Sequence, residues 1–219
     1  MTKYILKRVI YTLLILLAVS ALIFTIVHLG EGNPAEMMAA KPVIYLYPES
    51  RTAVSVELHI DGELSVTYPE YNGGWNVIAM PDGTLTDLTD GNEYSYLFWE
   101  AKMNTEYDFS QGFCVRGEDT ARFLRDILAR MGLAPREYNE FIVYWYPLMK
   151  DNAYNLISFQ GENYENAAEL TVNPAPDSVL RVFMAWKAVD SPVDIEPQSF
   201  SPFIREGFTL VEWGGSEIK

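Results

Sequence analysis

Cysteine, histidine and basic side chains are scarce in this chain of 219 residues, and each shortage excludes a class of function. A single cysteine cannot form a disulfide framework within the chain, and two histidines leave little for a His-rich metal site. Acidic residues outnumber basic ones 30 to 16, giving a net charge of -14 at pH 7. Because phosphate contacts require clustered Lys and Arg, we expect no nucleic-acid partner. Glycine-rich nucleotide loops and the Gly-x-Ser-x-Gly elbow of serine hydrolases are also absent from the sequence.

A long uncharged segment dominates the start of the chain. Residues 9–29 carry no charge, and as a helix they would extend about 30 Å, the thickness of a bilayer's hydrocarbon core. Basic residues precede this segment and acidic residues follow it (Lys3, Lys7 and Arg8, then Glu31 and Glu36). The sequence therefore predicts one N-terminal transmembrane helix, a signal anchor that leaves the N-terminus in the cytoplasm.

This interpretation divides the chain into four parts. They are a cytoplasmic N-terminus (1–8), the transmembrane helix (9–29), a juxtamembrane linker (30–40) and one extracytoplasmic domain (41–219). We expect a single-pass protein of the cell membrane with the bulk of the chain outside the cytoplasm. Two alternatives stay open: a signal peptide that is cleaved near Ala39-Ala40, and a buried core helix of a soluble protein.

The N-terminal residues carry a resemblance to a known family. The stretches Lys3–Ile10 and Leu29–Glu36, with Phe24 between them, resemble the first transmembrane helix and following loop of peptide-type ABC transporter permeases. The resemblance covers about the first 36 residues and implies an anchor, its orientation and an affinity for other membrane spans. A permease continues with further spans, and this sequence has no second long apolar run, so transport activity is not implied.

The remainder of the chain resembles a second group of proteins. From Lys41-Pro42-Val43-Ile44-Tyr45-Leu46-Tyr47-Pro48 to Val211-Glu212-Trp213-Gly214-Gly215, it is similar to uncharacterised bacterial surface or secreted proteins with a Tyr-Leu-Tyr-Pro opening. This resemblance implies no activity.

Acidic residues are concentrated in the predicted outer domain. All 30 of them follow residue 30, against 13 basic residues, which gives this part a net charge of -17. Such a charge keeps a domain soluble near an anionic membrane surface and disfavours polyanionic ligands.

Hydrophobic alternation predicts many short strands in this domain. Residues 43–47 and 94–100 are apolar runs typical of strands, whereas 53–60 alternates between apolar and polar positions. We expect a hairpin at Asp61-Gly62 that leads back through 64–68, and a second hairpin at Pro81-Asp82-Gly83. Further strands are expected later in the chain (155–159, 169–172, 180–188 and 208–212).

Two helices interrupt these strands. Asp119 or Thr120 can cap a helix with one apolar stripe, which Gly132 closes. Pro135 suits the first turn of a second helix, which we expect to end before Pro147. The predicted fold class is α+β: the N-terminal transmembrane helix, then one domain with a largely antiparallel sheet and a helical pair.

Residues capable of catalysis are present, but their surroundings do not single out a catalytic site. Cys114 is the only thiol, and the one histidine of the outer domain, His59, lies on the polar face of a predicted strand. Glu100 and Glu212 adjoin tryptophans, as glycosidase carboxylates do, but such neighbours arise by chance among 30 acidic residues. The acidic stretch around Asp82 fails the EF-hand spacing. We therefore assign no catalytic residue, no metal ligand and no cofactor.

Aromatic residues give the best indication of a ligand. Their flat apolar faces and polar edges suit sugars or peptide backbones, although a core of Tyr and Trp is the simpler explanation. The candidate binding residues are Trp75, Tyr94, Trp99, Glu100, Tyr144 and Trp145.

Together these features predict a membrane-anchored protein whose extracytoplasmic domain binds a ligand or partner. The resemblance of the anchor implies that transporter subunits of the ABC peptide class are candidate partners. The alternative is a surface enzyme that acts on cell-wall glycan or peptide.

Overall fold

The structure, a computed structural model, describes residues 7–8 and 39–218. Of these described residues, 43% lie in strands and 21% in helices. The expected α+β plan around one sheet is therefore wrong, because the domain is built mainly of strands arranged in two sheets. The transmembrane helix expected at 9–29 lies outside the described residues. Within the part that is described, no helix has the length and apolar character needed to cross a membrane.

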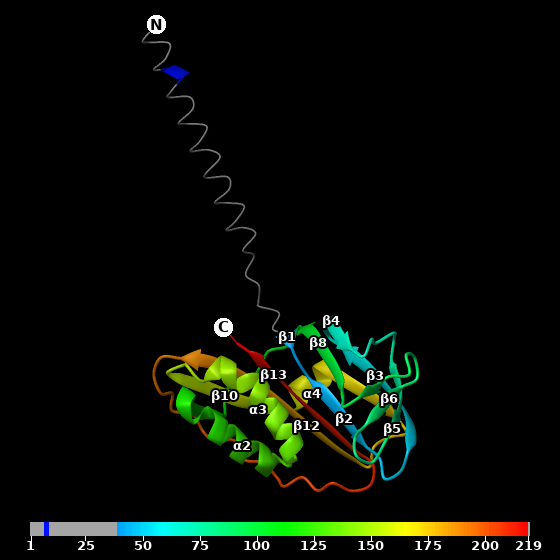
Figure 1. The fold of residues 1–219 in the computed structure, drawn as a ribbon. Helices are drawn as coiled ribbons and strands as arrows, with labels where there is room; N and C mark the ends of the chain where they lie inside the picture. The colour runs from blue at the N-terminus through cyan, green and yellow to red at the C-terminus, as the bar shows by residue number, and fades with distance from the viewer. Residues whose placement is uncertain (1–6, 9–38, 219) are drawn as a thin grey trace. The chain divides into compact units, whose positions relative to one another are not determined.

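The larger sheet contains eight strands among the described residues, and β13 lies at its centre (Figure 1). In spatial order they are β1 (Ala39–Ala40), β8 (Leu97–Met103), β2 (Val43–Tyr47), β13 (Thr209–Glu217), β12 (Ser178–Val189), β10 (Tyr154–Gln160) and β9 (Phe113–Arg116), with β4 (Gly62–Tyr68) also paired to β8. The pair β12–β13 is parallel, whereas the other pairs of this sheet are antiparallel.

The smaller sheet is antiparallel throughout its described strands. Its spatial order is β11 (Ala168–Asn173), β3 (Thr52–Ile60), β5 (Trp75–Ala79), β6 (Leu85–Asp87) and β7 (Glu93–Tyr94). The expected hairpin at Pro81-Asp82-Gly83 is confirmed, because β5 pairs with β6 and the Met80 N–H donates to the Thr84 carbonyl at 2.9 Å.

Side chains of the larger sheet alternate between two hydrophobic cores. On β2, Ile44 and Leu46 join the core shared with the smaller sheet, whereas Val43 and Tyr45 join the core beneath the helices. The helices are α2 (Thr120–Met131) and α3 (Pro135–Met149); a 3-10 turn, η1 (Gly117–Asp119), precedes them, and the short α4 (Glu162–Ala167) precedes β11. Helices, larger sheet and smaller sheet thus form three layers (Figure 1).

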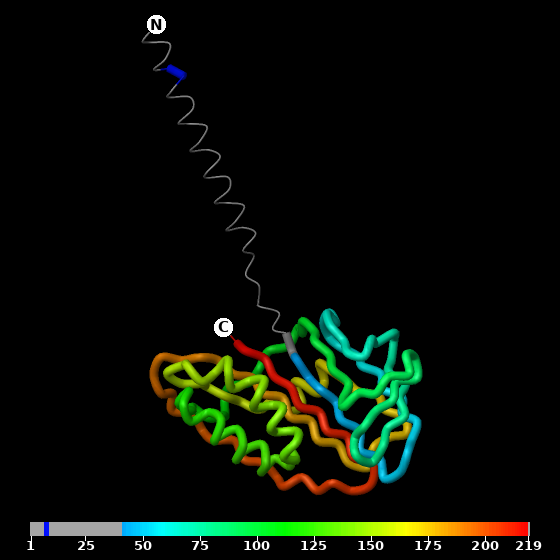
Figure 2. The backbone as a smooth tube through the Cα atoms, in the orientation of Figure 1, coloured from blue at the N-terminus to red at the C-terminus, as the bar shows by residue number. Residues whose placement is uncertain are grey.

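A long irregular segment, residues 190–208, connects the parallel strands β12 and β13. Figure 2 shows it in orange to red along the lower edge of the domain. The Gln198 amide accepts from the Phe159 N–H and donates to the Phe159 carbonyl, both at 2.8 Å. The Arg205 guanidinium donates to both carboxylate oxygens of Glu137 at the start of α3. These contacts hold the segment against the edge of β10 and against α3.

Two expected strand connections are wrong. Strand β4 does not form a hairpin with β3, because it leaves the smaller sheet at Gly62 and pairs with β8 in the larger one. The expected strand 94–100 divides into β7 and β8, which belong to different sheets. Alternation shows that one face of a segment is buried, but it does not identify the neighbouring strand.

The helix boundaries are partly as expected. Helix α2 ends at Gly132, whose φ of 109° lies in the left-handed region that suits glycine, and α3 begins at Pro135. Helix α3 does not end before Pro147 but continues to Met149. Trp145 and Met149 are buried in the helical core, and this packing offsets the hydrogen bond that proline cannot donate. The Val143 carbonyl consequently lacks its usual i+4 helical donor.

Replacing Pro147 with alanine restores this donor. We expect Pro147→Ala to raise the free energy of unfolding by about 1–2 kcal/mol, less than the ~3 kcal/mol helix penalty of proline, because proline also restricts the unfolded chain. Urea denaturation measures the change. Leu148→Ala, an exposed substitution on the same turn, serves as control and stays within about 0.5 kcal/mol of the parent. A Pro147→Ala protein no more stable than the parent would contradict this account of α3.

Candidate functional site

The structure places the three tryptophans that were predicted to bind a ligand inside the protein. Trp75 and Trp99 lie between the two sheets with at most 1% of their surface exposed, and Trp145 lies under the helices at 2%. The Trp75 indole N–H donates to the Pro69 carbonyl at 2.9 Å. These indoles therefore form core packing and present no face to a ligand.

Tyr94, Glu100 and Tyr144 lie nearer to the surface. The Tyr94 hydroxyl donates to Asp90, and its ring meets Tyr68 edge-on with 5.2 Å between centroids. Glu100 forms an ion pair with Lys41. Tyr144 lies on α3 with 41% of its surface exposed. Each of the three thus touches or lines one surface groove, which contains Tyr68 and Lys41.

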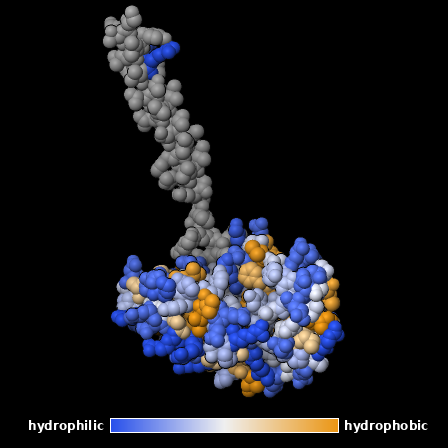
Figure 3. Space-filling view, in the orientation of Figure 1, coloured by the Kyte–Doolittle hydropathy of each residue, from blue (hydrophilic) through white to orange (hydrophobic). Residues whose placement is uncertain are grey.

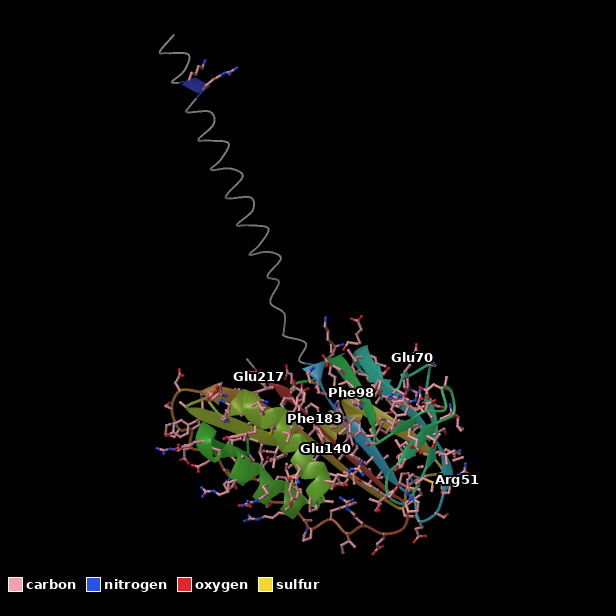
Figure 4. The ribbon with its side chains drawn as sticks, in the orientation of Figure 1. Arg51, Glu70, Phe98, Glu140, Phe183 and Glu217 are labelled. Atoms are coloured by element: carbon pink, nitrogen blue, oxygen red, sulfur yellow. The ribbon has the colours of Figure 1, made fainter. Side chains whose placement is uncertain are left out.

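This surface, called here the aromatic groove, lies between α3 and the larger sheet and has a volume of about 690 Å³. Figure 3 shows hydrophobic residues at the surface over α3 on this face, and Figure 4 labels Phe98 on β8 and Glu140 on α3, which both line the groove. The groove is lined by Lys41, Val43, Tyr68, Tyr96, Phe98, Asn139, Glu140, Val143, Tyr144 and Trp213.

The floor of the aromatic groove is one row of side chains across four strands. Tyr68 on β4 pairs with Phe98 on β8, Phe98 pairs with Val43 on β2, and Val43 pairs with Trp213 on β13. Residues directly opposite each other in a sheet share a face, and neighbouring strands are about 4.8 Å apart. The row is therefore about 14 Å long and runs at right angles to the strands.

The wall of the aromatic groove comes from α3. Asn139, Glu140, Val143 and Tyr144 recur at helical spacing, so they share one face of the helix. The opposite face carries Phe141, Trp145 and Met149 into the core. The helical spacing of the wall residues can be recognised in the sequence, separately from that of the core residues. The floor residues could not be predicted in this way, because strand register determines which residues lie next to one another.

Hydrogen bonds at the base of the groove fix the position of Glu140. The Tyr45 hydroxyl donates to a Glu140 carboxylate oxygen at 2.5 Å and accepts from the Trp213 indole N–H at 3.3 Å. Burial, and then this glutamate, raise the pKa of Tyr45 well above its usual value. Burial and the Glu140 charge also raise the pKa of Tyr96. Both phenols therefore stay protonated at neutral pH.

Glu212, one of the candidate glycosidase carboxylates, lies in the core between the sheets. It is 1% exposed and accepts from the Arg181 Nε at 2.6 Å, the Tyr164 hydroxyl at 3.0 Å and the Trp99 indole N–H at 3.3 Å. Burial is the largest single influence and lowers the pKa of Arg181, but the Glu212 charge and hydrogen bond, together with Tyr164 and Glu165, raise this pKa above its usual value. The pair is a buried structural interaction that no substrate reaches in this conformation.

Breaking this pair leaves a buried charge without a partner. We expect Arg181→Met to lower the free energy of unfolding by about 3–5 kcal/mol, and the double variant Arg181→Met/Glu212→Gln to recover part of this loss because no charge remains buried. Urea denaturation of both single variants and the double variant gives the coupling energy. A loss below about 1 kcal/mol for Arg181→Met would contradict the structural role.

The structure also places the remaining candidates. Cys114 is half-buried on β9, where its sulfur accepts from the Val193 N–H at 3.3 Å, and His59 lies on β3 in the other sheet. Asp82, Asp87 and Asp90 each accept from the N–H two residues further on, as turn aspartates do. Over 7–8 and 39–218, no three Asp, Glu, His or Cys side chains cluster as metal ligands would.

Comparison with known proteins finds a relative that matches part of the chain. No known protein family and no solved structure matches the chain. An "Uncharacterized protein in bglA 3'region" of Butyrivibrio fibrisolvens is 51% identical over 63 residues, which cover 27% of this chain and 64% of the relative. The chain thus spans slightly less than two thirds of that relative's length, and the printed name states no activity.

Proposed function

We propose that residues 41–219 form an extracytoplasmic binding domain and that the aromatic groove is its ligand site. The volume and the lining of the groove support this proposal. A volume of about 690 Å³ lies within the range of small-molecule sites, and the lining combines aromatic faces with a few polar groups. Tyr68 and Val143 expose 61% and 75% of their surface, although burial would stabilise such apolar groups.

The distribution of carboxylates favours binding over the alternative of a surface enzyme that acts on cell-wall glycan or peptide. A glycosidase needs two carboxyl groups on either side of the scissile bond. Among the residues that the structure describes, Glu140 is the one carboxylate that lines the aromatic groove, while Glu212 is enclosed in the core and Glu100 is paired with Lys41.

Ligand-observed NMR of the full chain with a mixed panel of short peptides, saccharides, nucleosides and amines tests the proposed site. We expect at least one panel member to bind, and Tyr144→Ala to weaken that binding tenfold or more because an aromatic contact is lost. Tyr146→Ala, on the same helix but outside the groove lining, is the matched control and leaves affinity unchanged. Equal binding by Tyr144→Ala and the parent, or no binder in the panel, would refute the site.

We further propose that residues 9–29 anchor this domain to the cell membrane and that the N-terminus is cytoplasmic. The uncharged length of the segment and the basic residues before it support the proposal. The resemblance of residues 1–36 to peptide-type permeases makes subunits of an ABC peptide transporter the proposed membrane partners.

Surface labelling of whole cells tests the orientation. A membrane-impermeant amine reagent is expected to modify Lys102 and Lys150, which are exposed on the domain, while a cytoplasmic marker protein stays unmodified. Mass spectrometry of the full-length protein from the membrane fraction identifies the modified lysines. Labelling of Lys102 and Lys150 only after lysis would show the opposite orientation.

A further inference from the structure

We propose that the ligand of the aromatic groove is a neutral, extended oligosaccharide of two or three pyranose rings. The inference rests on the proposed function and specifies its ligand class. It is drawn from the charges, the floor and the hydrogen-bonding groups of the groove.

The charges around the aromatic groove are already paired. Lys41 lies against Glu100, with roughly a quarter of each side chain exposed. Glu140 accepts from the Tyr45 hydroxyl and has the Arg136 guanidinium at 3.7 Å. A charged ligand would meet no unpaired opposite charge here and would lose hydration on entry. Anions are further disfavoured by the net charge of -17 beyond residue 30.

Aromatic ring faces are available at the outer end of the floor. Tyr68, with 61% of its surface exposed, and the neighbouring Phe98 lie there, whereas Val43 and Trp213 are buried and close the inner end of the row. Successive members of the row are about 4.8 Å apart. This interval is close to the length of one pyranose ring in an extended β-linked chain, whose C–H faces stack on aromatic rings. A row about 14 Å long accommodates two to three such rings.

Hydrogen-bonding groups without protein partners surround this floor. Within the described part of the chain, the Asn139 amide and the hydroxyls of Tyr68, Tyr96 and Tyr144 make no hydrogen bond. Both donors and acceptors are therefore available, as a ligand rich in hydroxyl groups requires.

A peptide fits this arrangement less well. Peptides commonly bind by adding a strand to an exposed sheet edge, where unpaired backbone groups are available. The floor residues Phe98 and Val43 each lie between two neighbouring strands and pair with both. Tyr68 lies on β4, which pairs only with β8 among the described strands. A peptide could therefore add a strand only beside β4, at one end of the floor, and not along the row.

Isothermal titration calorimetry of the full chain in lipid nanodiscs, free of sugar-based detergent, tests the inference. The probes are cellotriose, xylotriose and mannotriose, with the anionic trigalacturonate and the peptides tri-alanine and Ala-Lys-Ala as comparison. We expect a neutral trisaccharide to bind at least tenfold more tightly than the anionic one and both peptides. Because the ligand carries no charge, its affinity should change less than twofold between 50 and 500 mM NaCl.

Variants of the floor and wall separate stacking from hydrogen bonding. Tyr68→Ala should weaken trisaccharide binding tenfold or more. Tyr68→Phe keeps the aromatic ring, so its affinity for the trisaccharide should fall only a few-fold. Asn139→Ala should lower the affinity for the trisaccharide a few-fold, and Tyr146→Ala should leave this affinity unchanged. Far-UV circular dichroism of each variant checks that the fold is retained.

The outcomes distinguish the inference from the proposed function. Binding of a peptide but no saccharide, with the same sensitivity to Tyr68→Ala, would overturn the saccharide inference and leave the binding site in place. Saccharide binding that Tyr68→Ala and Asn139→Ala do not alter would also overturn it. Absence of binding by any probe refutes the inference, and the wider ligand panel then decides on the proposed function.

Discussion

The buried ion pair between Arg181 and Glu212 is the constraint on which the rest of the domain depends. Strand β13 is buried along eight of its nine residues, so a charge on this strand must find its partner inside the protein. The partner lies directly opposite on the parallel strand β12. A shift of one residue in this register would separate the two charges and turn the side chains of β13 to the wrong faces. The pair therefore makes any other register of the central strands costly.

That register also determines what the groove contains. With Glu212 turned towards the smaller sheet, the next residue, Trp213, must point to the other face, where it packs beneath α3 and closes the row begun by Tyr68. Trp213 donates to Tyr45, and Tyr45 donates to Glu140 on the helix. A chain of contacts thus connects the central strand to the wall of the groove. The groove is organised by the core rather than by a surface loop.

Local patterns in the sequence predicted the elements better than their partners. Alternation and turn residues located the strand before Pro48, the hairpin at Pro81-Asp82-Gly83 and the end of α2 at Gly132. The assignment of β3 and β4 to different sheets depends on contacts far apart in the chain, and so does the continuation of α3 through Pro147. Of the six candidate binding residues, Tyr144 alone lines the groove. The tryptophans are covered by the second sheet and by the helices, which hydrophobicity at a single position does not reveal.

The irregular segment between β12 and β13 affects whether another copy of the domain can pair with the edge of the larger sheet. An open sheet edge displays backbone groups that can pair with another copy of the chain. Strand β9 pairs with β10 only as far as Ile157, which leaves the backbone of Phe159 beyond its end. The Gln198 side chain occupies that position and satisfies both backbone groups of Phe159, as a further strand would. At this position of β10, a single amide thus takes the place that the backbone of another chain would need.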